Sequence, residues 1–463
     1  MSNTQTLNSS SESTLKSIIV LAWPIIAEQL MHTAVMYIDT AMVGTLGTEA
    51  TASVGATSSI SFLLFSVLSA LGVAFLSHIA RANGAEDMER TRELAVQALM
   101  VVFIAGIALT MLPLALSSRI PVWLQVDEAI RESSRIYFII VSTPVLFRAS
   151  SIIFSAALRA VGDTRTPMKA GIAVNLTNVS LNFLLIYPTR SLTIFGFTFT
   201  MPGAGMGVFG AAAASAIAFV TGGLLIFIAF WRHPKLSPRG RKIRLDLTVL
   251  LPCLKTALPN ILQRFGVSLG FVVFATMINS LGQASTAANT IANTVEQLFY
   301  IPGFGMQIAA STLIGNAYGA NDGRLMKKYS SIFMPLEVTI MFFAGLALFI
   351  SAPFLTSLFS DNPEVIKLGS TVLRMVAVSE PFYGFGLITE GFMFGVGKTK
   401  APFVYNIITM WGIRIVGTYI CTQILGMGLI SVWSCMIAHN MVIFLIYVVI
   451  YTRQLWNPLR DQK

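Results

Sequence analysis

Titratable residues on one face of an apolar segment are the first sign of chemistry in this sequence. Glu28, His32 and Asp39 are spaced by four and seven residues. At 100° per residue the three side chains lie on one face of a helix. A carboxylate in lipid costs roughly 3 kcal/mol or more, so we expect Asp39 to face other helices or water. Burial disfavours the charged form of a carboxyl group, which would let Asp39 load and release a proton near neutral pH.

A structural interpretation of the same residues stays open. Hydrogen bonds to neighbouring helices alone could hold Asp39 in place. Glu28 and His32 lie nearer the start of the segment. They could form a structural pair there and take no part in any ion or ligand binding.

A cluster of amides follows in a later apolar segment. Asn175, Asn178 and Asn182 are spaced by three and four residues and share one helical face. They could bridge to Asp39, or their oxygens could ligate a cation, which makes a sodium site at Asp39, Asn178 and Asn182 one interpretation. Packing between helices through hydrogen bonds is the other. The second half of the chain carries Met410, Ile413 and Gly417 at the positions that match these amides, so we expect ion coupling in the first half only.

A looser polar set in the second half is interpreted as part of a small-molecule cavity. Its members are Arg264, Asn293, Glu296, Gln297, Tyr300 and Glu390, to which the first half would add Glu28, Met31, His32 and Met36. We expect Glu296 to pair with Arg264, because a pair neutralises both charges within the membrane. Glu390 is expected to be a gate or a solvated residue. The thioethers of the methionines adapt to ligands of many shapes.

The composition is that of a polytopic membrane protein. Of the 463 residues 55% are hydrophobic and 11% charged, whereas soluble domains carry about 25% charged residues. The formal net charge of +10 is therefore interpreted as a signal of orientation, not of nucleic-acid binding. The three cysteines have no metal-like spacing. We expect no cofactor.

Twelve apolar segments are each long enough to span a bilayer. Their centres are near Leu30, Leu64, Ile104, Ser142, Thr177, Ala218, Phe265, Leu298, Ile340, Tyr383, Ile413 and Asn440. The connecting segments on one side hold 22 of the 31 basic residues. That side, with both termini, is therefore predicted to be cytoplasmic.

The two halves repeat each other at one constant offset along the chain. "AVGDTRTP" (160–167) matches "GVGKTKAP" (395–402), and Pro24 matches Pro259. The Gly-Val-Gly-Lys-Thr of the second copy resembles the end of a phosphate-binding loop, but the glycine that such a loop needs is replaced by Phe392. We therefore interpret it as a repeated cytoplasmic turn. Each repeat has six spans, which predicts two lobes related by a pseudo-two-fold axis along the membrane normal.

The predicted organisation has five parts. Residues 1–14 form a disordered cytoplasmic tail, 15–231 the first lobe, 232–247 a basic cytoplasmic linker, 248–455 the second lobe and 456–463 a second cytoplasmic tail. The fold class is an all-α membrane protein of twelve transmembrane helices in two six-helix lobes.

Several motifs in this order resemble the multidrug and toxic compound extrusion (MATE) family. They are "TAMVGTLG", "RANGAEDMERT", "ALRAVGDTRTP", "GMGVFGAA" and "LIGNAYGANDG", and the resemblance covers about residues 15–455. It implies the two-lobed fold of that family, export of organic cations in exchange for protons or sodium, a functional Asp39, and a hydroxyl from Ser215 that faces the amide cluster.

Two departures from the family pattern bear on the coupling ion. Asn182 stands where some members have an Asp that helps to hold sodium, and Gly266 stands where the NorM branch has a Glu. The resemblance is therefore closer to the DinF-like, proton-driven branch.

The function that follows is a secondary active multidrug efflux antiporter and not an enzyme. Its partners would be drug or toxin molecules and membrane lipid, and we expect a monomer in the bacterial inner membrane. A lipid-linked oligosaccharide flippase is the alternative, but it would need clustered basic residues for a pyrophosphate group. A membrane-embedded transferase would need paired acidic motifs at helix ends, and a channel would need a filter-like loop; the sequence contains neither.

Overall fold

The computed structural model describes residues 2–124, 126–194 and 197–455, and this part of the chain is mainly helical. The elements of the first half are α1 (Ser2–Gly44), α2 (Thr48–Gly84), α3 (Met88–Ala115), α4 (Ile120–Trp123), α5 (Glu128–Ser142), α6 (Val145–Ala160), α7 (Arg165–Leu185), β1 (Pro188–Ile194), β2 (Phe197–Ala204) and α8 (Gly207–Arg232). Those of the second half are α9 (Leu247–Asn279), α10 (Gln283–Phe299), α11 (Ile301–Gly319), α12 (Gly323–Ser357), α13 (Pro363–Gly395), α14 (Lys400–Thr409), η1 (Met410–Ile415), α15 (Val416–Tyr419), η2 (Ile420–Ile424), α16 (Leu429–Ile450) and η3 (Tyr451–Leu455).

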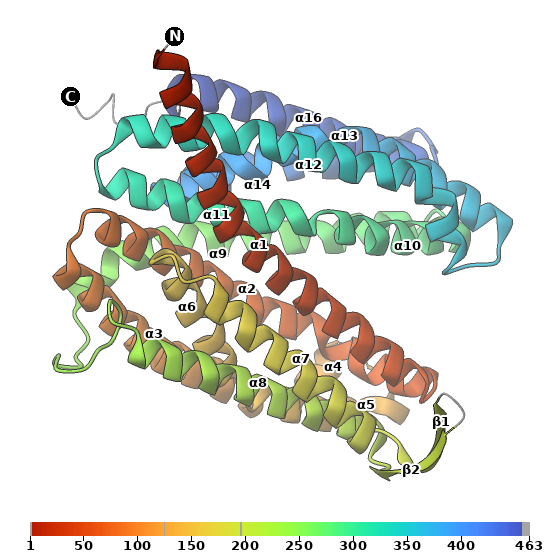
Figure 1. The fold of residues 1–463 in the computed structure, drawn as a ribbon. Coiled ribbons are helices and arrows are strands. Elements are labelled where there is room, and N and C mark those ends of the chain that lie inside the picture. Colours follow the sequence, from red (N-terminus) through yellow and green to blue (C-terminus); the bar gives the residue numbers. More distant parts are fainter. Residues whose placement is uncertain (1, 125, 195–196, 456–463) are drawn as a thin grey trace. The chain divides into compact units, whose positions relative to one another are not determined.

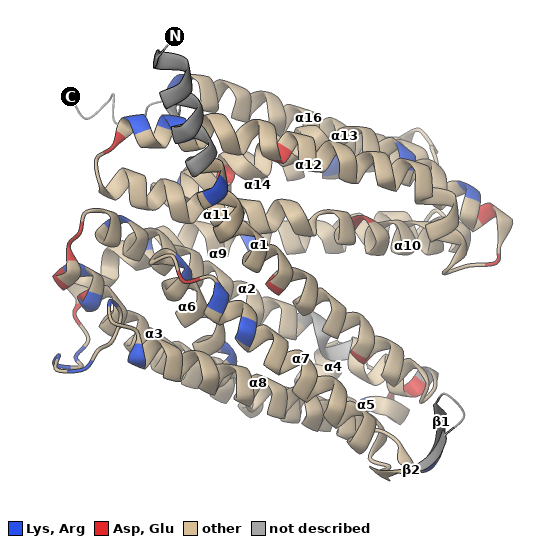
Figure 2. Cartoon of the chain, in the orientation of Figure 1, with Lys and Arg blue, Asp and Glu red and all other residues tan. Residues whose placement is uncertain are grey.

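The described helices are those of a multi-pass membrane protein. Eight are long and apolar enough to cross a membrane, and there are ten if the bent pairs α5–α6 (44°) and α10–α11 (43°) each form one span. Charged residues gather at helix ends and in the connecting loops (Figure 2). Two further long helices, α7 and α13, carry more polar and charged residues within their length. The count of twelve spans stays a prediction.

One compact unit, here called the N-unit, comprises Ala27–Ile79 and Asp87–Cys253. Helix α8 packs against α6 and α7, and α6 packs against α3 (Figure 1). Small residues allow this close approach: a Cβ added at Gly223 of α8 would lie 2.5 Å from the carbonyl oxygen of Phe147. An antiparallel hairpin of β1 and β2 joins α7 to α8, with Arg190 opposite Met201.

The second compact unit, the C-unit, comprises Met1–Ile26, Ala80–Glu86 and Leu254–Lys463. Helix α13 is central in it and packs against α10, α11, α12 and α16. Its core contains fully buried aromatic side chains, among them Phe333, Phe392 and Trp433. Ile18 and Ile25 of α1 belong to the same apolar cluster as Phe333 and Phe392.

The repeat seen in the sequence has a structural counterpart in the turns. Left-handed backbone conformations occur in pairs at equivalent positions of the two halves: Gly47 (φ 111°) with Gly282 (97°), Glu86 (56°) with Asn321 (54°), and Gly162 (93°) with Gly397 (80°). Asp87 accepts a hydrogen bond from the backbone N–H of Arg90 and so caps α3, and Asp322 caps α12 in the same way. The two halves therefore use the same turn chemistry.

The structure differs from the predicted segments at the N-terminus. Helix α1 begins at Ser2, so residues predicted as a disordered tail are helical, because the helix of the first span continues beyond its apolar part. Helix α8 ends at Arg232 and α9 begins at Leu247. The tail predicted for residues 456–463 lies outside the described residues.

Candidate functional site

The strongest candidate is the carboxylate of Asp39 in the N-unit, which lies against α7 and α8. The side chain of Asn182 donates to Asp39 Oδ1. The hydroxyl of Ser215 donates to Asp39 Oδ2 at 3.2 Å, and Asn178 Nδ2 lies 3.5 Å from the same oxygen. Three helices thus converge on one carboxylate, which satisfies its acceptors within an apolar unit.

The amides of this site also bond to one another. Asn182 Nδ2 donates to Asn178 Oδ1 at 3.0 Å, and Asn178 Nδ2 lies 3.2 Å from Ser215 Oγ. Asn178, Asn182 and Ser215 are at most 7% exposed. The Oδ1 atom of Asn182 is buried and has no hydrogen-bond partner in the structure. The spacing of three and four residues on α7 therefore does place two amides on Asp39, as the sequence suggested.

The third amide and the other candidates of α1 lie outside this network. Asn175 makes no hydrogen bond among the residues that the structure describes. Glu28 forms an ion pair of 2.8 Å with Arg159 of α6, and the ring of His32 lies 5.7 Å from that of Phe65. Met31 is partly buried and Met36 is 60% exposed. Glu28 is thus held in a pair that joins α1 to α6.

Tyr137 lies near Asp39 and also near Arg148, and no pattern in the sequence connects these residues. Tyr137 of α5 interacts electrostatically with both Asp39 and Arg148. The guanidinium of Arg148 lies over the rings of Phe219 (4.5 Å) and Phe65 (5.9 Å). No carboxylate lies within 4 Å of it among the described side chains. An arginine inside an apolar segment is itself the signal that could have identified it.

The C-unit has a second carboxylate, Glu296 of α10, which is 4% exposed. The hydroxyl of Tyr300 donates to Glu296, and Arg414 of η1 is the cation that interacts with it electrostatically. We expected Glu296 to pair with Arg264, and this expectation was wrong. The π-helical turn that contains Arg414 places its guanidinium over the rings of Phe274 (4.2 Å) and Phe271 (4.9 Å).

Glu390 of α13 is held by amides from three other helices. Gln263 and Gln307 each donate to one of its oxygens at 2.9 Å, and Asn406 donates to it at 3.3 Å. Arg264 donates to Asn260 at 3.1 Å and interacts electrostatically with Glu390. Glu390 is therefore not simply a solvated residue near the inner loop.

The remaining candidates of α10 differ in their contacts and in their exposure. The side chain of Asn293 donates to the carbonyl of Asn289 at 2.9 Å, and the ring of Tyr300 lies 4.6 Å from that of Tyr383. Gln297 is exposed. The polar cluster predicted along α10 stays a prediction.

Two buried carboxyl groups of the C-unit have no hydrogen-bond partner among the residues that the structure describes. Glu337 of α12 and Glu380 of α13 are 0% exposed, and neither oxygen of either group has a hydrogen-bond partner in the structure. A charge in such surroundings costs several kcal/mol, so the uncharged acid is the favoured form. Glu337 is not among the residues predicted from the sequence, although a Glu in an apolar run is a recognisable signal.

The sequence is similar to those of known proteins along most of its length. The sequence profile of a family described as MatE matches residues 24–184 and 259–420. The "Probable multidrug resistance protein NorM" of Thermotoga maritima is 26% identical over 428 residues, which cover 91% of this chain and 89% of that protein. The "Multidrug resistance protein PmpM" of Pseudomonas aeruginosa is 23% identical over 412 residues, 86% of this chain and 82% of that protein.

Solved structures share the fold. The "Crystal structure of MATE in complex with MaD3S" superposes with a TM-score of 0.87 at 22% identity, and covers 96% of both chains. A MOP superfamily transporter from Pyrococcus furiosus gives a TM-score of 0.86 at 22% identity, again over 96% of both chains. The fold is therefore that of the MATE transporters of the MOP superfamily.

Proposed function

Because this chain belongs to the MatE family, we propose that it is a secondary active efflux antiporter for cationic and amphipathic organic compounds. Relatives named multidrug resistance proteins support this proposal. The proposed coupling ion is the proton, and Asp39 is its proposed carrier. We place the protein in the bacterial inner membrane as a monomer, with both termini in the cytoplasm.

The observation that carries the proposal is the set of donors on Asp39. Ser215, Asn178 and Asn182 stabilise the carboxylate when it is charged. Protonation removes the charge and weakens these charge-assisted bonds, which contribute about 1.5–3 kcal/mol each. A single proton can therefore change how tightly α7 and α8 are held to α1.

The proposed cycle follows from this change. Protonation of Asp39 from the outside removes the negative charge that holds a cationic drug, and the drug leaves outward. The protein then turns inward, releases the proton to the cytoplasm and binds the next drug molecule. A ligand shifts such an equilibrium only through its different affinity for the two states, and the charge of Asp39 supplies that difference.

The amides of this site are oriented as donors to Asp39. Asn182 donates through its Nδ2 to Asp39, and its Oδ1 makes no hydrogen bond among the described residues. A cation bound between Asp39, Asn178 and Asn182 needs oxygen ligands, so the amide of Asn182 would have to turn by half a rotation. Sodium is the alternative coupling ion, and its binding requires this rotation of the Asn182 amide.

The assignment to the DinF-like branch has one structural support. A Cβ added at Gly266 would lie 2.3 Å from Ile407 Cδ1. Glycine supplies no carboxylate at the position at which the NorM branch has its glutamate, and the movable end of the Ile407 side chain lies beside it. We propose that the C-unit lacks a NorM-type sodium site for this reason.

The test is dye efflux from vesicles in which pH and sodium gradients are imposed separately. We expect a pH gradient to drive efflux of a cationic dye such as ethidium, and we expect Asp39→Asn to abolish it. Asp361→Asn is the matched control, because Asp361 is exposed and lies in the loop between α12 and α13. Normal efflux by Asp39→Asn would contradict the proposal.

Two other outcomes separate the alternatives. Efflux driven only by sodium would assign the cation to the site of Asp39, Asn178 and Asn182. No dye movement under either gradient would favour the lipid-linked oligosaccharide flippase. The buried cations give that alternative little support, because Arg148 and Arg414 each lie over aromatic rings in different units.

A further inference from the structure

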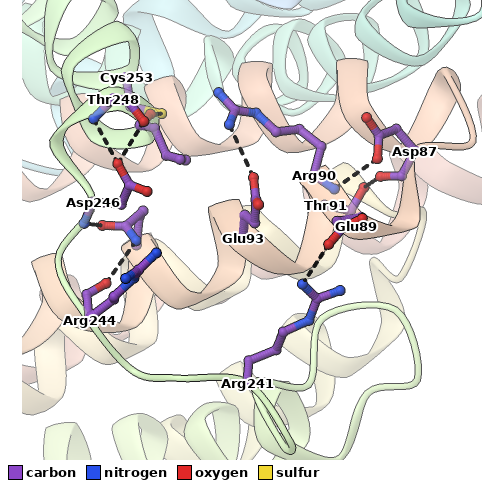
Figure 3. A network of polar contacts seen from close by, with 12 residues as sticks. Asp87, Glu89, Arg90, Thr91, Glu93, Arg241, Arg244, Asp246, Thr248 and Cys253 are labelled. Atoms are coloured by element: carbon purple, nitrogen blue, oxygen red, sulfur yellow. Dashed lines mark hydrogen bonds and ion pairs between the residues drawn. The ribbon is translucent and has the colours of Figure 1, made fainter.

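The basic linker between α8 and α9 is attached to α3 by several side chains, and Arg92 of α3 donates to the carbonyl of Pro234 at 3.1 Å. The side-chain amide of Gln97, which is 3% exposed, donates to the carbonyl of Arg244 at 3.1 Å and accepts from the N–H of Asp246 at 3.0 Å. Arg241 reaches from the linker to Glu89 of α3 at 3.0 Å (Figure 3). The backbone of residues 241–246 is thus fixed at both ends.

Between these attachments lies a cavity of about 380 Å³. It is lined by Glu93, Val96, Gln97, Gly240, Arg241, Lys242, Arg244, Asp246 and Val249. All of these residues belong to the N-unit. The cavity is therefore a feature of one unit and lies at the ends of helices.

The two acidic side chains of the cavity already have partners. Glu93 pairs with Arg90 at 3.1 Å. Asp246 accepts from the hydroxyl of Thr248 at 2.6 Å and from its N–H at 2.9 Å, and these bonds hold the pKa of Asp246 below its ordinary value (Figure 3). Both carboxylates thus already have partners within the N-unit.

Two cations of the cavity form no ion pair among the described residues, although the charge of Arg244 contributes to the lowered pKa of Asp246. Lys242 and Arg244 are exposed, and neither has a carboxylate within 4 Å among the described residues. Arg241, the third basic residue, is held by Glu89. Two adjacent positive charges are therefore available to an anionic ligand, and phosphate is a common partner for an arginine beside a lysine.

The residues between these cations are apolar and lie outside the cavity. The linker alternates in the sequence Lys242-Ile243-Arg244-Leu245, and only the basic members line the cavity. Ile243 is 51% exposed, Leu245 42% and Leu247 63%. An extended segment with cations on one side and exposed aliphatic side chains on the other suits the boundary between head groups and acyl chains.

We propose that this cavity binds the phosphate-containing head group of an anionic phospholipid. Lys242 and Arg244 contact the phosphate, and Ile243, Leu245 and Leu247 contact the acyl chains. The exposed aliphatic side chains favour a lipid over a free phosphate, because a soluble anion would leave them in water. The bound head group then connects the linker with the cytoplasmic ends of α3 and α9. Basic pockets on the cytoplasmic side attract anionic head groups because the surface of that leaflet is negatively charged.

The test compares lipid retention by the full-length protein and a double variant. Phosphatidylglycerol or phosphatidylcholine is titrated into protein in a neutral detergent, and bound lipid is counted by native mass spectrometry. We expect the wild type to retain phosphatidylglycerol preferentially. Lys242→Gln/Arg244→Gln should lower that affinity about 30-fold, or about 2 kcal/mol, at roughly 1 kcal/mol per basic residue.

The matched control removes two charges from the same segment but not from the cavity. Arg232→Gln/Arg239→Gln alters exposed residues that do not line it, and its lipid affinity should equal that of the wild type. An equal loss in both double variants would overturn the site, because attraction to total charge would then explain the binding. Unchanged retention by Lys242→Gln/Arg244→Gln would overturn it as well.

A second arm distinguishes the source of the phosphate. Inorganic phosphate and glycerol phosphate are added as competitors at up to millimolar concentration. We expect that neither inorganic phosphate nor glycerol phosphate displaces phosphatidylglycerol when competitor and lipid are present at equal concentration. Displacement by inorganic phosphate at such concentrations would overturn the lipid assignment in favour of a soluble anion. These readouts do not depend on efflux, so failure of the proposed transport function would leave them unchanged.

Discussion

Gly84 and Gly319 each pack against a carbonyl of the helix that carries the other. A Cβ added at Gly84 of α2 would lie 1.9 Å from the oxygen of Asn316, and one added at Gly319 of α11 would lie 1.9 Å from the oxygen of Arg81. In the sequence repeat Gly84 matches Gly319, and Arg81 matches Asn316. The contact is therefore built from equivalent residues of the two repeats, within the C-unit.

Substitution of either glycine should destabilise this contact. We expect Gly84→Ala and Gly319→Ala each to lower the free energy of unfolding by about 1–3 kcal/mol, because backbone atoms must move to admit the methyl group. Thermal unfolding in detergent measures the change. Gly55→Ala is the control, since a Cβ there meets nothing within 4 Å. Equal melting temperatures for all three variants would contradict the contact.

Loss of the Ser215 hydroxyl should slow proton-driven efflux. Ser215→Ala removes one of the donors to Asp39, and a hydrogen bond to a charged group contributes about 1.5–3 kcal/mol. We expect the efflux rate under a pH gradient to fall about tenfold or more. Thr221→Val removes a hydroxyl from the same helix that bonds only to the carbonyl of Ile217, and it should transport normally. Unchanged transport by Ser215→Ala would exclude Ser215 from the coupling site.

Arg148 should influence which compounds are exported. Its guanidinium lies over the rings of Phe219 and Phe65 and forms no ion pair among the described residues. We therefore expect it to attract an anionic group of a ligand and to repel a cationic one. We expect Arg148→Gln to slow export of zwitterionic compounds about tenfold or more while cationic dyes leave at least as fast.

The control for Arg148 is a second arginine that lies over a ring. Arg374 lies 5.6 Å from the ring of Phe349 but is exposed. Arg374→Gln should leave the relative rates of export of zwitterionic and cationic compounds unchanged. Competition between a zwitterionic and a cationic substrate in the same vesicles measures the ratio of their export rates. The same ratio in wild type and Arg148→Gln would show that Arg148 only supports packing.

Glu337 should tolerate replacement by its uncharged analogue. Both of its oxygens are buried without a partner, which favours the neutral acid. Glu337→Gln should therefore change the free energy of unfolding by less than about 1 kcal/mol, whereas Glu337→Ala should cost about 2 kcal/mol or more through the cavity that it leaves. Thermal unfolding of both variants measures this. A large gain in stability for Glu337→Gln would mean that the native carboxyl group is charged.

Much of the architecture was predictable because it depends on local patterns. Apolar segments of span length predicted a multi-pass helical protein, and the repeat in the sequence predicted paired turns. Glu86 and Asn321 show this pairing without any glycine, since both adopt φ near 55°. The face shared by Asn178 and Asn182 was also predictable, because helical periodicity alone brings them together.

The sequence by itself determined the apolar helices, the repeat and the helical face that Asn178 and Asn182 share. Only the tertiary structure decided which charges are partners: Glu28 pairs with Arg159, and Glu296 interacts with Arg414 instead of Arg264. Spacing along one helix fixes a face, but it does not say which distant helix packs against that face. The partner of a buried charge is set by packing between helices, which no local pattern records.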